Sequence, residues 1–344
     1  MSNLQKPIIG ITMGDPAGIG PEICAHLFED TTLYENSNCF VVGDASCIQH
    51  AIDKITKSCL KVNPLTCVKD AKFTPGCIDV YDLANVDMSK LRLGQVSKNA
   101  GNAAFEYVKK VIDLALSKEV DATVTAPINK EALNEAGHHF SGHTEIYAHY
   151  TNTKKYAMML VHDKLRVIHV STHVSLRQAC DMVKKERVEQ VISLADEVLR
   201  QMGINEPLIA VAGLNPHAGE NGMFGKEELE EIQPAVESSN NTGMKVIGPI
   251  PPDTVFSKAA GGLYDVVIAM YHDQGHIPIK MAGFKYGNKN TSQISGINIT
   301  LGLPIIRVSV DHGTAFDIAG KNIASPNSLR ESVDYAIRLV KGKK

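Results

Sequence analysis

The sequence lacks three features that would assign a protein to a class at once: a strong net charge, a long hydrophobic run and paired cysteines. Its 344 residues contain 35 Lys and Arg against 38 Asp and Glu, which is a formal net charge of −3. Without a basic surface we expect no nucleic-acid partner. No stretch approaches the roughly 18 apolar residues of a membrane span, and the first residues lack a signal-peptide pattern. We therefore expect a cytoplasmic protein that does not bind membranes.

The seven cysteines are odd in number and include no CxxC pair. This usage is typical of scattered reduced thiols in a cytoplasmic protein. The composition, 44% hydrophobic and 21% charged, is that of an ordinary globular protein and excludes a disordered chain. A chain of 344 residues has room for about two domains and needs neither a disulfide nor a metal merely to fold.

Short apolar runs alternate with longer amphipathic stretches along the chain. We expect buried strands at residues 8–13, 40–42, 122–125, 158–160, 167–170, 208–212, 266–270 and 305–308. We expect one helix that begins at Pro21 and four more that cover residues 98–119, 176–202, 226–238 and 328–341. This alternation predicts an α/β fold with a largely parallel sheet, in which functional residues follow the carboxyl ends of the strands.

A glycine-rich segment, Gly14–Glu22, joins the first expected strand to the first expected helix. It is not a Rossmann dinucleotide fingerprint, because the third glycine that the fingerprint requires is replaced by Ile23. Nor is it a Walker A loop, since no Gly-Lys-Ser/Thr follows. A loop that lets the backbone approach an anionic ligand and a purely structural turn are equally compatible with these residues.

Five histidines lie in loops that follow expected strands: His143, His173, His217, His272 and His312. A single loop histidine is usually solvated or hydrogen-bonded. Several at equivalent strand ends can converge, and three neutral imidazoles with an open position suit a catalytic divalent metal. The histidines are far apart in the sequence, so both interpretations stay open at this point.

Lys280, Asn298 and Arg307 follow the His272 loop and could hold a phosphate or a carboxylate. The alternative is a solvated Lys280 and a surface Arg307. Arg307 interrupts an apolar run, where an unpaired charge is costly, and this favours a ligand role. We expect the charged runs at 184–187 and 227–231 to be solvated helix faces.

Eight motifs resemble, in order and content, those of the 4-hydroxythreonine-4-phosphate dehydrogenase family, and they cover almost the whole chain. They are MGDPAGIGPEI (13–23), GHTE (142–145), STH (171–173), GLNPHAGE (213–220), PPDT (251–254), MYHDQG (270–275), INITLGLPIIR (297–307) and DHGTAFDIAG (311–320). The first and last also resemble loops of the wider β-decarboxylating dehydrogenases, the isocitrate and isopropylmalate type. The resemblance implies two α/β/α domains without a Rossmann fingerprint. Residues 1–128 with 300–344 would form the cofactor side, and residues 129–299 the metal, substrate and dimer side.

The resemblance also implies the site residues. His173, His217 and His272 match the family's metal ligands, for one Zn²⁺, Co²⁺ or Mg²⁺ ion per subunit. The positions that match substrate-binding residues are His143, Thr144, Lys280, Asn298 and Arg307. The two loops on the cofactor side contribute Gly14, Asp15, Gly18, Gly20, His312, Gly313, Thr314, Asp317 and Gly320. The family site lies at a homodimer interface, so the three histidines need not come from one subunit.

The implied reaction is the NAD-dependent oxidation of the 3-hydroxyl of a 4-phosphorylated four-carbon hydroxy acid, followed by loss of CO₂ from the β-keto acid. The divalent ion would lower the pKa of the alcohol and stabilise the enolate. A general base must take the alcohol proton and an acid must protonate the enolate. Lys280 and Asp273 are our candidates for these two roles.

Residues 281–297 resemble an insertion relative to the vitamin B6 enzymes of the family. Together with His276-Ile277-Pro278, the insertion favours the branch that acts on D-threonate or D-erythronate 4-phosphate and yields dihydroxyacetone phosphate. The alternative within the family is the synthesis of pyridoxal 5'-phosphate from 4-hydroxythreonine 4-phosphate. Two other classes stay open: a phosphate acyltransferase, which needs no metal, and a non-catalytic protein that binds a phosphometabolite.

Overall fold

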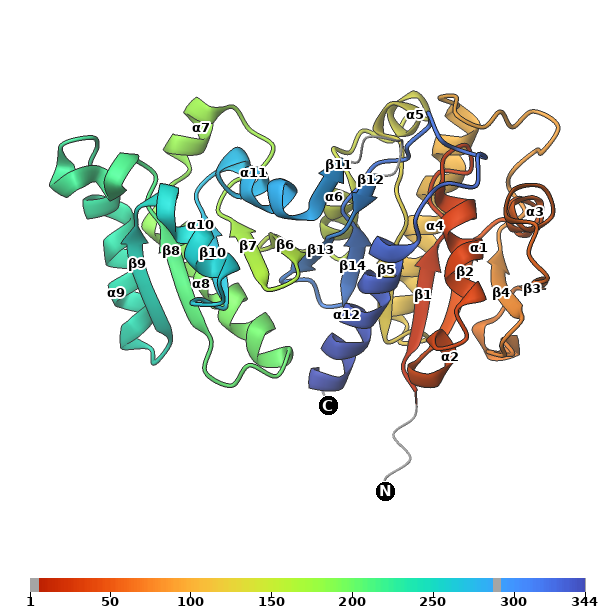
Figure 1. Ribbon diagram of the computed structural model, residues 1–344, viewed down its shortest axis with the longest axis horizontal. Coiled ribbons are helices and arrows are strands. Elements are labelled where there is room, and N and C mark those ends of the chain that lie inside the picture. Colours follow the sequence, from red (N-terminus) through yellow and green to blue (C-terminus); the bar gives the residue numbers. More distant parts are fainter. Residues whose placement is uncertain (1–5, 287–291, 344) are drawn as a thin grey trace, which may run out of the picture. The chain divides into compact units, whose positions relative to one another are not determined.

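The computed structural model describes residues 6–286 and 292–343 (Figure 1). Contacts within the chain divide it into two compact units. The first contains the chain up to Lys154 and also Leu303–Lys341, while the second contains Lys155–Gly302 and the chain from Gly342. Each unit combines a sheet with helices, so the predicted α/β fold is confirmed.

The first unit contains a parallel sheet with the strand order β3-β4-β2-β1-β5-β14. Its strands are β1 (Ile8–Thr12), β2 (Asn38–Gly43), β3 (Lys61–Leu65), β4 (Cys77–Asp82), β5 (Ala122–Thr125) and β14 (Arg307–Val310). Its helices are α1 (Gly20–Glu29), α2 (Leu33–Asn36), α3 (Ala45–His50), α4 (Lys98–Leu116), α5 (Lys130–Glu135), α6 (His143–Tyr150) and most of α12 (Asn327–Lys343). The buried face of α4 packs over β1, β2 and β5, which places the apolar core between that helix and the sheet.

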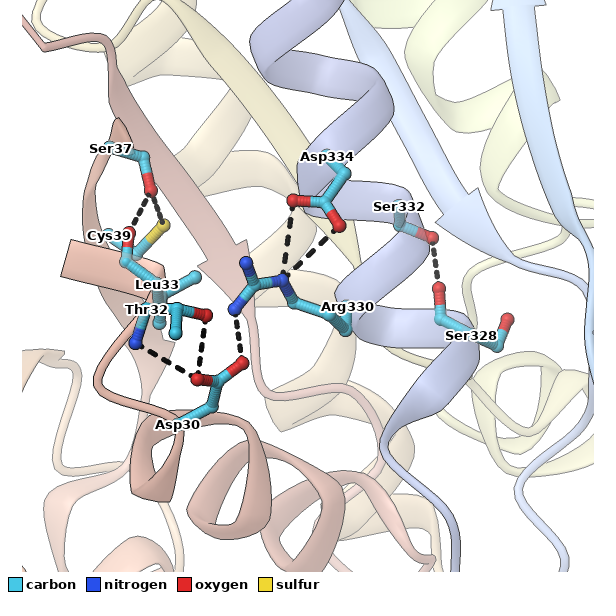
Figure 2. Close-up of polar contacts among 9 residues, drawn as sticks. All are labelled: Asp30, Thr32, Leu33, Ser37, Cys39, Ser328, Arg330, Ser332 and Asp334. Carbon is cyan, nitrogen blue, oxygen red and sulfur yellow. Dashed lines mark hydrogen bonds and ion pairs between the residues drawn. The ribbon is translucent and has the colours of Figure 1, made fainter. Parts of the chain in front are cut away.

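The C-terminal segment completes the first unit in two places. Strand β14 pairs in parallel with β5, and Arg307 lies opposite Thr123. On α12, Arg330 donates a hydrogen bond to Asp30 at the end of α1 and also contacts Asp334 on its own helix (Figure 2). Because Asp30 and Arg330 are 300 residues apart in the sequence, the first unit is made of two distant parts of the chain.

The second unit contains a mixed sheet with the strand order β13-β6-β7-β10-β8-β9. Its strands are β6 (Ala157–His162), β7 (Leu165–His169), β8 (Leu208–Ala212), β9 (Lys245–Ile250), β10 (Val266–Ala269) and β13 (Ile297–Leu301). Its helices are α7 (Leu176–Asp181), α8 (Lys185–Gln201), α9 (Gln233–Asn241), α10 (Pro252–Ala260) and α11 (His272–Gly283). The pairs β13–β6 and β6–β7 are antiparallel, and β7, β10, β8 and β9 run parallel.

A separate hairpin lies inside the predicted insertion, residues 281–297. Strand β11 (Phe284–Tyr286) pairs antiparallel with β12 (Ser292–Ile294). Residues 287–291 of the insertion lie outside the described residues. The effect of the insertion on specificity therefore stays a prediction.

The single helix predicted over 176–202 is wrong, because two helices occupy this segment. A capping box between Ser175 and Gln178 begins α7, which ends at Asp181. Helix α8 begins at Lys185, whose backbone N–H donates to the carboxylate of Glu231 at 2.8 Å. The first N–H groups of a helix have no partner within the helix, and the Glu231 side chain provides one for Lys185. The apolar periodicity of the sequence runs on through both helices and does not reveal the break between them.

The contacts of the chain and the predicted domain division differ over residues 129–154. These residues belong to the first unit, where α5 packs directly on α4. A Cβ on Gly101 of α4 would lie 2.2 Å from the carbonyl oxygen of Ala132, so only glycine allows this close approach. The functional division into a cofactor side and a metal side stays a prediction.

All seven cysteines are unpaired in the structure. None of the helices within residues 6–286 and 292–343 is both long and apolar enough to span a membrane.

Candidate active site

Three adjacent parallel strands of the second unit carry the three histidines that the motifs assign to a metal. Val267 of β10 lies opposite Val167 of β7, and its neighbour Val266 lies opposite Ile209 of β8. The three strands therefore end at one edge of the sheet, where loops in parallel α/β folds bind ligands. The loop after β7 carries His173, the loop after β8 carries His217, and α11 begins at His272 directly after β10.

The structure brings two of these histidines together. The ring centroids of His173 and His272 are 5.9 Å apart, whereas the His217 ring lies 6.3 Å from that of Phe224. Within the described residues, no three His, Cys, Asp or Glu side chains are close enough together to hold a metal ion. The three-histidine ligand set thus stays a prediction, with two of its members in mutual contact.

His173 and His272 line one cavity of about 570 Å³, a volume in the range of small-molecule sites. Other polar residues that line it are Thr172, Ser175, Tyr271 and Asp273. The cavity lies within the second unit, next to the ends of β7 and β10.

The surroundings of His272 suit a metal ligand. Asp273 Oδ1 lies 2.6 Å from His272 Nδ1, and a carboxylate on one imidazole nitrogen leaves the other nitrogen to bind a metal. The ring of His276 stacks on that of His272 with centroids 3.7 Å apart. Burial lowers the pKa of His276 to about 4, so this neighbour is neutral at neutral pH. Imidazole nitrogens, one ring held by a carboxylate, are a donor set that fits a divalent ion.

The His217 loop has an unusual backbone. Five consecutive residues, 217–221, have φ values between 44° and 79°. This left-handed conformation costs about 1–2 kcal/mol for each residue other than glycine, so other contacts must hold it. The start of the loop, just before these residues, is held by the carboxylate of Glu228, which accepts hydrogen bonds from the backbone N–H of Leu214 and of Asn215, both at 2.7 Å.

Glu228 also corrects an expectation from the sequence. The acidic run at 227–231 was predicted to be a solvated helix face, but Glu228 is only 1% exposed. The prediction is wrong at this position because the loop that carries His217 folds over the carboxylate. No residue-type pattern in the sequence marks Glu228, since its main partners are backbone groups.

In the first unit, Arg307 is buried and not on the surface. It is 2% exposed, its Nη2 donates to Thr125 Oγ1 at 2.9 Å, and its guanidinium lies 5.6 Å from the centroid of the Tyr147 ring. Burial lowers the pKa of Arg307 to about 10, so the side chain keeps its charge at neutral pH. The interrupted apolar run marks Arg307 in the sequence, whereas no motif marks its neighbours Thr125 and Tyr147.

His143, at the start of α6, lies near this guanidinium. Its Nε2 is inaccessible to solvent and has no hydrogen-bond partner among the described residues. Burial and, to a lesser extent, the charge of Arg307 lower the pKa of His143, so its ring is neutral. A buried guanidinium beside an imidazole nitrogen with unused hydrogen-bonding capacity can bind an anionic group. Thr144 follows His143 on α6, while Lys280 on α11 and Asn298 on β13 belong to the second unit and are half-buried.

The two predicted cofactor loops meet within the first unit. The backbone N–H of Ile19 donates to the carbonyl oxygen of Thr314 at 3.1 Å. Gly313 is exposed, and a Cβ placed on it would meet no atom within 4 Å, which leaves room for a ligand beside the half-buried His312. Asp317 is exposed as well, and Gly320 donates its N–H to Glu22 at 3.1 Å. An exposed backbone turn of this kind fits a bound cofactor.

The glycine-rich segment itself is packed against its own chain. Gly14, Asp15, Gly18 and Gly20 are buried, and a Cβ on Gly20 would lie 2.0 Å from the carbonyl oxygen of Met13. Burial raises the pKa of the Asp15 carboxyl to about 6. Close packing explains these glycines, and their part in cofactor binding stays a prediction.

Comparison with known proteins adds an independent observation. The family model described as pyridoxal phosphate biosynthetic protein PdxA matches residues 35–336 of the chain. The chain belongs to the PdxA family. This membership confirms the resemblance that the sequence motifs indicated.

Several named dehydrogenases match the chain over nearly its whole length. The D-threonate 4-phosphate dehydrogenase of Pectobacterium atrosepticum is 47% identical, over 97% of this chain and 100% of that protein. The D-threonate 4-phosphate dehydrogenase of Salmonella typhimurium is 46% identical, over 98% of this chain and 100% of that protein. A crystal structure of 4-hydroxythreonine-4-phosphate dehydrogenase from Klebsiella pneumoniae superimposes with a TM-score of 0.84 at 46% identity, covering 97% of this chain and 100% of that one.

Proposed function

We propose that this PdxA-family protein oxidises the 3-hydroxyl of D-threonate 4-phosphate or D-erythronate 4-phosphate with NAD. Hydride leaves C3 for the nicotinamide, and the hydroxyl proton goes to a base. The 3-keto acid then loses its carboxylate as CO₂, and protonation at C2 gives dihydroxyacetone phosphate. The observation that carries the proposal is the 46–47% identity to two D-threonate 4-phosphate dehydrogenases over almost the entire chain.

The protein is an oxidoreductase of the dehydrogenase class, as its family and its relatives show. Within that class one alternative substrate has specific support. The Klebsiella structure is named for 4-hydroxythreonine 4-phosphate, and the family description names pyridoxal phosphate biosynthesis. The experiment below therefore includes both kinds of substrate.

Each unit supplies residues that suit the proposed substrate. In the first unit, Arg307 keeps a buried positive charge and His143 has an unused buried nitrogen, so together with Thr144 they suit the phosphate or the carboxylate. In the second unit, Lys280 and Asn298 are the proposed substrate contacts. Binding at groups remote from C3 orients the reacting carbon and lowers the barrier through positioning.

A divalent metal would be held by His173, His217 and His272, and when bound it supplies a Lewis acid that lowers the pKa of the substrate alcohol. Asp273 keeps His272 oriented through its 2.6 Å contact. Lys280 lies about two turns after His272 on α11, and we propose it as the base that takes the hydroxyl proton. Asp273 is the proposed acid that protonates C2, after it has taken up a proton, for which the hydroxyl proton received by Lys280 is the proposed source.

Two further proposals concern NAD and assembly. The loop that contains His312, Gly313 and Thr314 is the proposed NAD-binding segment, because its exposed backbone leaves room for a ligand.

We also propose a cytoplasmic homodimer with the active site at the subunit interface. The separate position of His217 supports a site that a second copy completes, and the native mass in solution tests the dimer. Mixing the inactive His173→Ala and His217→Ala variants restores turnover if one site draws histidines from both subunits.

The substrate assignment is tested by measuring NADH formation with purified protein and added Zn²⁺, Co²⁺ or Mg²⁺. D-threonate 4-phosphate, D-erythronate 4-phosphate and 4-phosphohydroxy-L-threonine are compared side by side. We expect metal-dependent turnover of a sugar acid that exceeds turnover of the amino acid. Strong turnover of the amino acid alone would place the protein in vitamin B6 synthesis. Absence of metal-dependent turnover with all three would contradict the proposed chemistry and leave the fold unaffected.

A further inference from the structure

At the ends of β7, β10 and β8, where the three histidine loops begin, buried polar groups form a connected row of hydrogen bonds. Its centre is Gln274, on the first turn of α11, which is only 8% exposed. The Oε1 of Gln274 accepts from the backbone N–H of Met270 at 2.7 Å, and its Nε2 donates to the carbonyl oxygen of Gly213 at 2.8 Å. One side chain thus joins the end of β10 to the end of β8, although Gln274 and Gly213 are 61 residues apart.

The row continues in both directions. Toward β7, the hydroxyl of Ser171 donates to the carbonyl oxygen of Met270 at 2.9 Å, and Ser171 is 4% exposed. Toward the His217 loop, Gly213 is followed by Leu214 and Asn215, whose N–H groups bind the buried Glu228. Ser171 precedes His173 by two positions, and Gln274 follows His272 by two. Each histidine loop is therefore attached to the same row close to its histidine.

We infer that Gln274 is a positioning residue for the proposed metal ligands, because it holds the ends of the two strands whose loops carry His217 and His272, in one site or in the two sites of a dimer. This inference rests on the proposed metal-binding function. A buried amide that satisfies one donor and one acceptor on two different strands constrains their separation, since neither backbone group can move without losing its partner. Groups behind metal ligands commonly change metal affinity by about 10–100-fold.

The test is the Co²⁺ affinity of the apoprotein, measured from the absorption of the bound ion in competition with a chelator. Gln274→Met keeps the length of the side chain and removes both hydrogen bonds. We expect about 10–100-fold weaker Co²⁺ binding, and recovery of turnover when Co²⁺ is in excess, because the ligands themselves are unchanged.

Asn240 provides a matched control in the same unit. Its side-chain amide donates to the carbonyl oxygen of Val246 at 2.8 Å and accepts from the N–H of the same residue at 2.9 Å. Asn240 is exposed, and Asn240→Leu removes a pair of side-chain bonds to the backbone away from the histidine loops. We expect Asn240→Leu to lower the thermal midpoint and to leave the Co²⁺ affinity at the wild-type value.

A milder pair of variants covers the case in which Gln274→Met does not fold. Ser171→Ala removes the hydrogen bond to Met270, and Ser239→Ala removes a buried bond to Ala235 within α9. Only Ser171→Ala should weaken Co²⁺ binding.

The outcomes separate this inference from the proposed function. If His217→Ala and His272→Ala bind Co²⁺ like the wild type, the metal lies elsewhere and both proposals are overturned. If these two variants lose the ion while Gln274→Met and Ser171→Ala bind it normally, only the positioning role is overturned.

Discussion

The two units differ in which of their polar side chains are buried. In the first unit the side chains proposed to bind ligands are themselves buried: Arg307 is 2% exposed, Asp15 is fully buried and His143 Nε2 is inaccessible. In the second unit His173 and His217 are exposed, and the buried polar groups are those that hold their loops, Gln274 and Glu228. Burial fixes the position of a charge but shifts its pKa. Buried side chains such as Gln274 and Glu228 instead fix the loop, so the imidazole on that loop stays exposed and can bind a ligand from solvent.

The largest expected effect lies at an exposed histidine of the second unit. His217→Ala should abolish metal-dependent turnover and metal binding while the fold is retained, because an exposed side chain contributes little to packing. Metal content, turnover and the circular dichroism spectrum are measured together, with the exposed His139→Ala as the control. Unchanged turnover in His217→Ala would remove the metal assignment.

At the buried arginine of the first unit, we expect a large loss in binding. Arg307→Met should lower kcat/KM at least about 100-fold, which corresponds to about 3 kcal/mol, because it removes a desolvated charge that faces an anionic substrate. Arg307→Lys keeps the charge without the planar fork and should recover only part of the loss. Steady-state kinetics with the preferred substrate measure both. Wild-type kinetics in Arg307→Met would show that the buried charge serves only the fold.

The buried carboxyl of Asp15 should be visible in the pH dependence of stability. Its pKa is raised from 3.8 to about 6, so between these values the unfolded chain releases a proton that the folded chain retains. The free energy of unfolding therefore falls by about 2 kcal/mol from this group as the pH rises from 4 to 6, and by about 3 kcal/mol in total once the pH is well above 6. Asp15→Asn removes this slope.

Urea unfolding of the wild type and of Asp15→Asn at pH 4 and pH 7 measures the difference. We expect Asp15→Asn to gain stability relative to the wild type at pH 7. Parallel pH profiles of the two proteins would show that Asp15 ionises normally in the folded state.

In the second unit, a substitution of the buried Glu228 should lower stability more than a substitution of its exposed neighbour Glu230. Glu228 Oε1 accepts from the backbone N–H groups of Leu214 and Asn215, and Oε2 accepts from the side-chain amide of Asn215 at 2.9 Å. Glu228→Gln replaces one of these two acceptor oxygens by an NH2 donor. We expect a loss of about 1–3 kcal/mol in the free energy of unfolding. The exposed Glu230→Gln is the matched control and should stay within about 0.5 kcal/mol of the wild type. Equal values for the two variants would mean that Glu228 does not hold the His217 loop.

The smallest expected effect concerns the ion pair of Arg330 and Asp30. The Arg330 side chain is 24% exposed and that of Asp30 is 42% exposed, so solvent screens their attraction. Arg330→Ala should lower the free energy of unfolding by less than about 1 kcal/mol. Differential scanning calorimetry checks this value. A much larger loss would show that a partly exposed ion pair can stabilise the fold as strongly as a buried one.

Much of the fold could be predicted because local patterns decide it. The strands Ala122–Thr125 and Leu208–Ala212 have the predicted bounds, since each is a short apolar run buried in a parallel sheet. The break between α7 and α8 could not be predicted, because it depends on Glu231, which lies 46 residues beyond Lys185. The strand expected at 305–308 is observed at Arg307–Val310, where pairing with β5 decides its bounds.

The candidate site was predictable only in part, for a related reason. Histidines and Arg307 stand out because their residue types have specific chemistry in motifs. Gln274 and Glu228 do not stand out, because their partners are backbone groups that only the folded chain brings near. The association of His173 with His272, without His217, likewise depends on loop conformations that no spacing rule describes.

The path of the chain has a consequence for protein synthesis. The second unit is one continuous stretch for nearly all of its length, whereas the first needs both Thr123 on β5 and Arg307 on β14. On the ribosome, the sheet of the first unit therefore waits for its last strand until the whole second unit has been translated. A chain that ends before Leu303 lacks Arg307, so no buried guanidinium reaches Thr125 on β5.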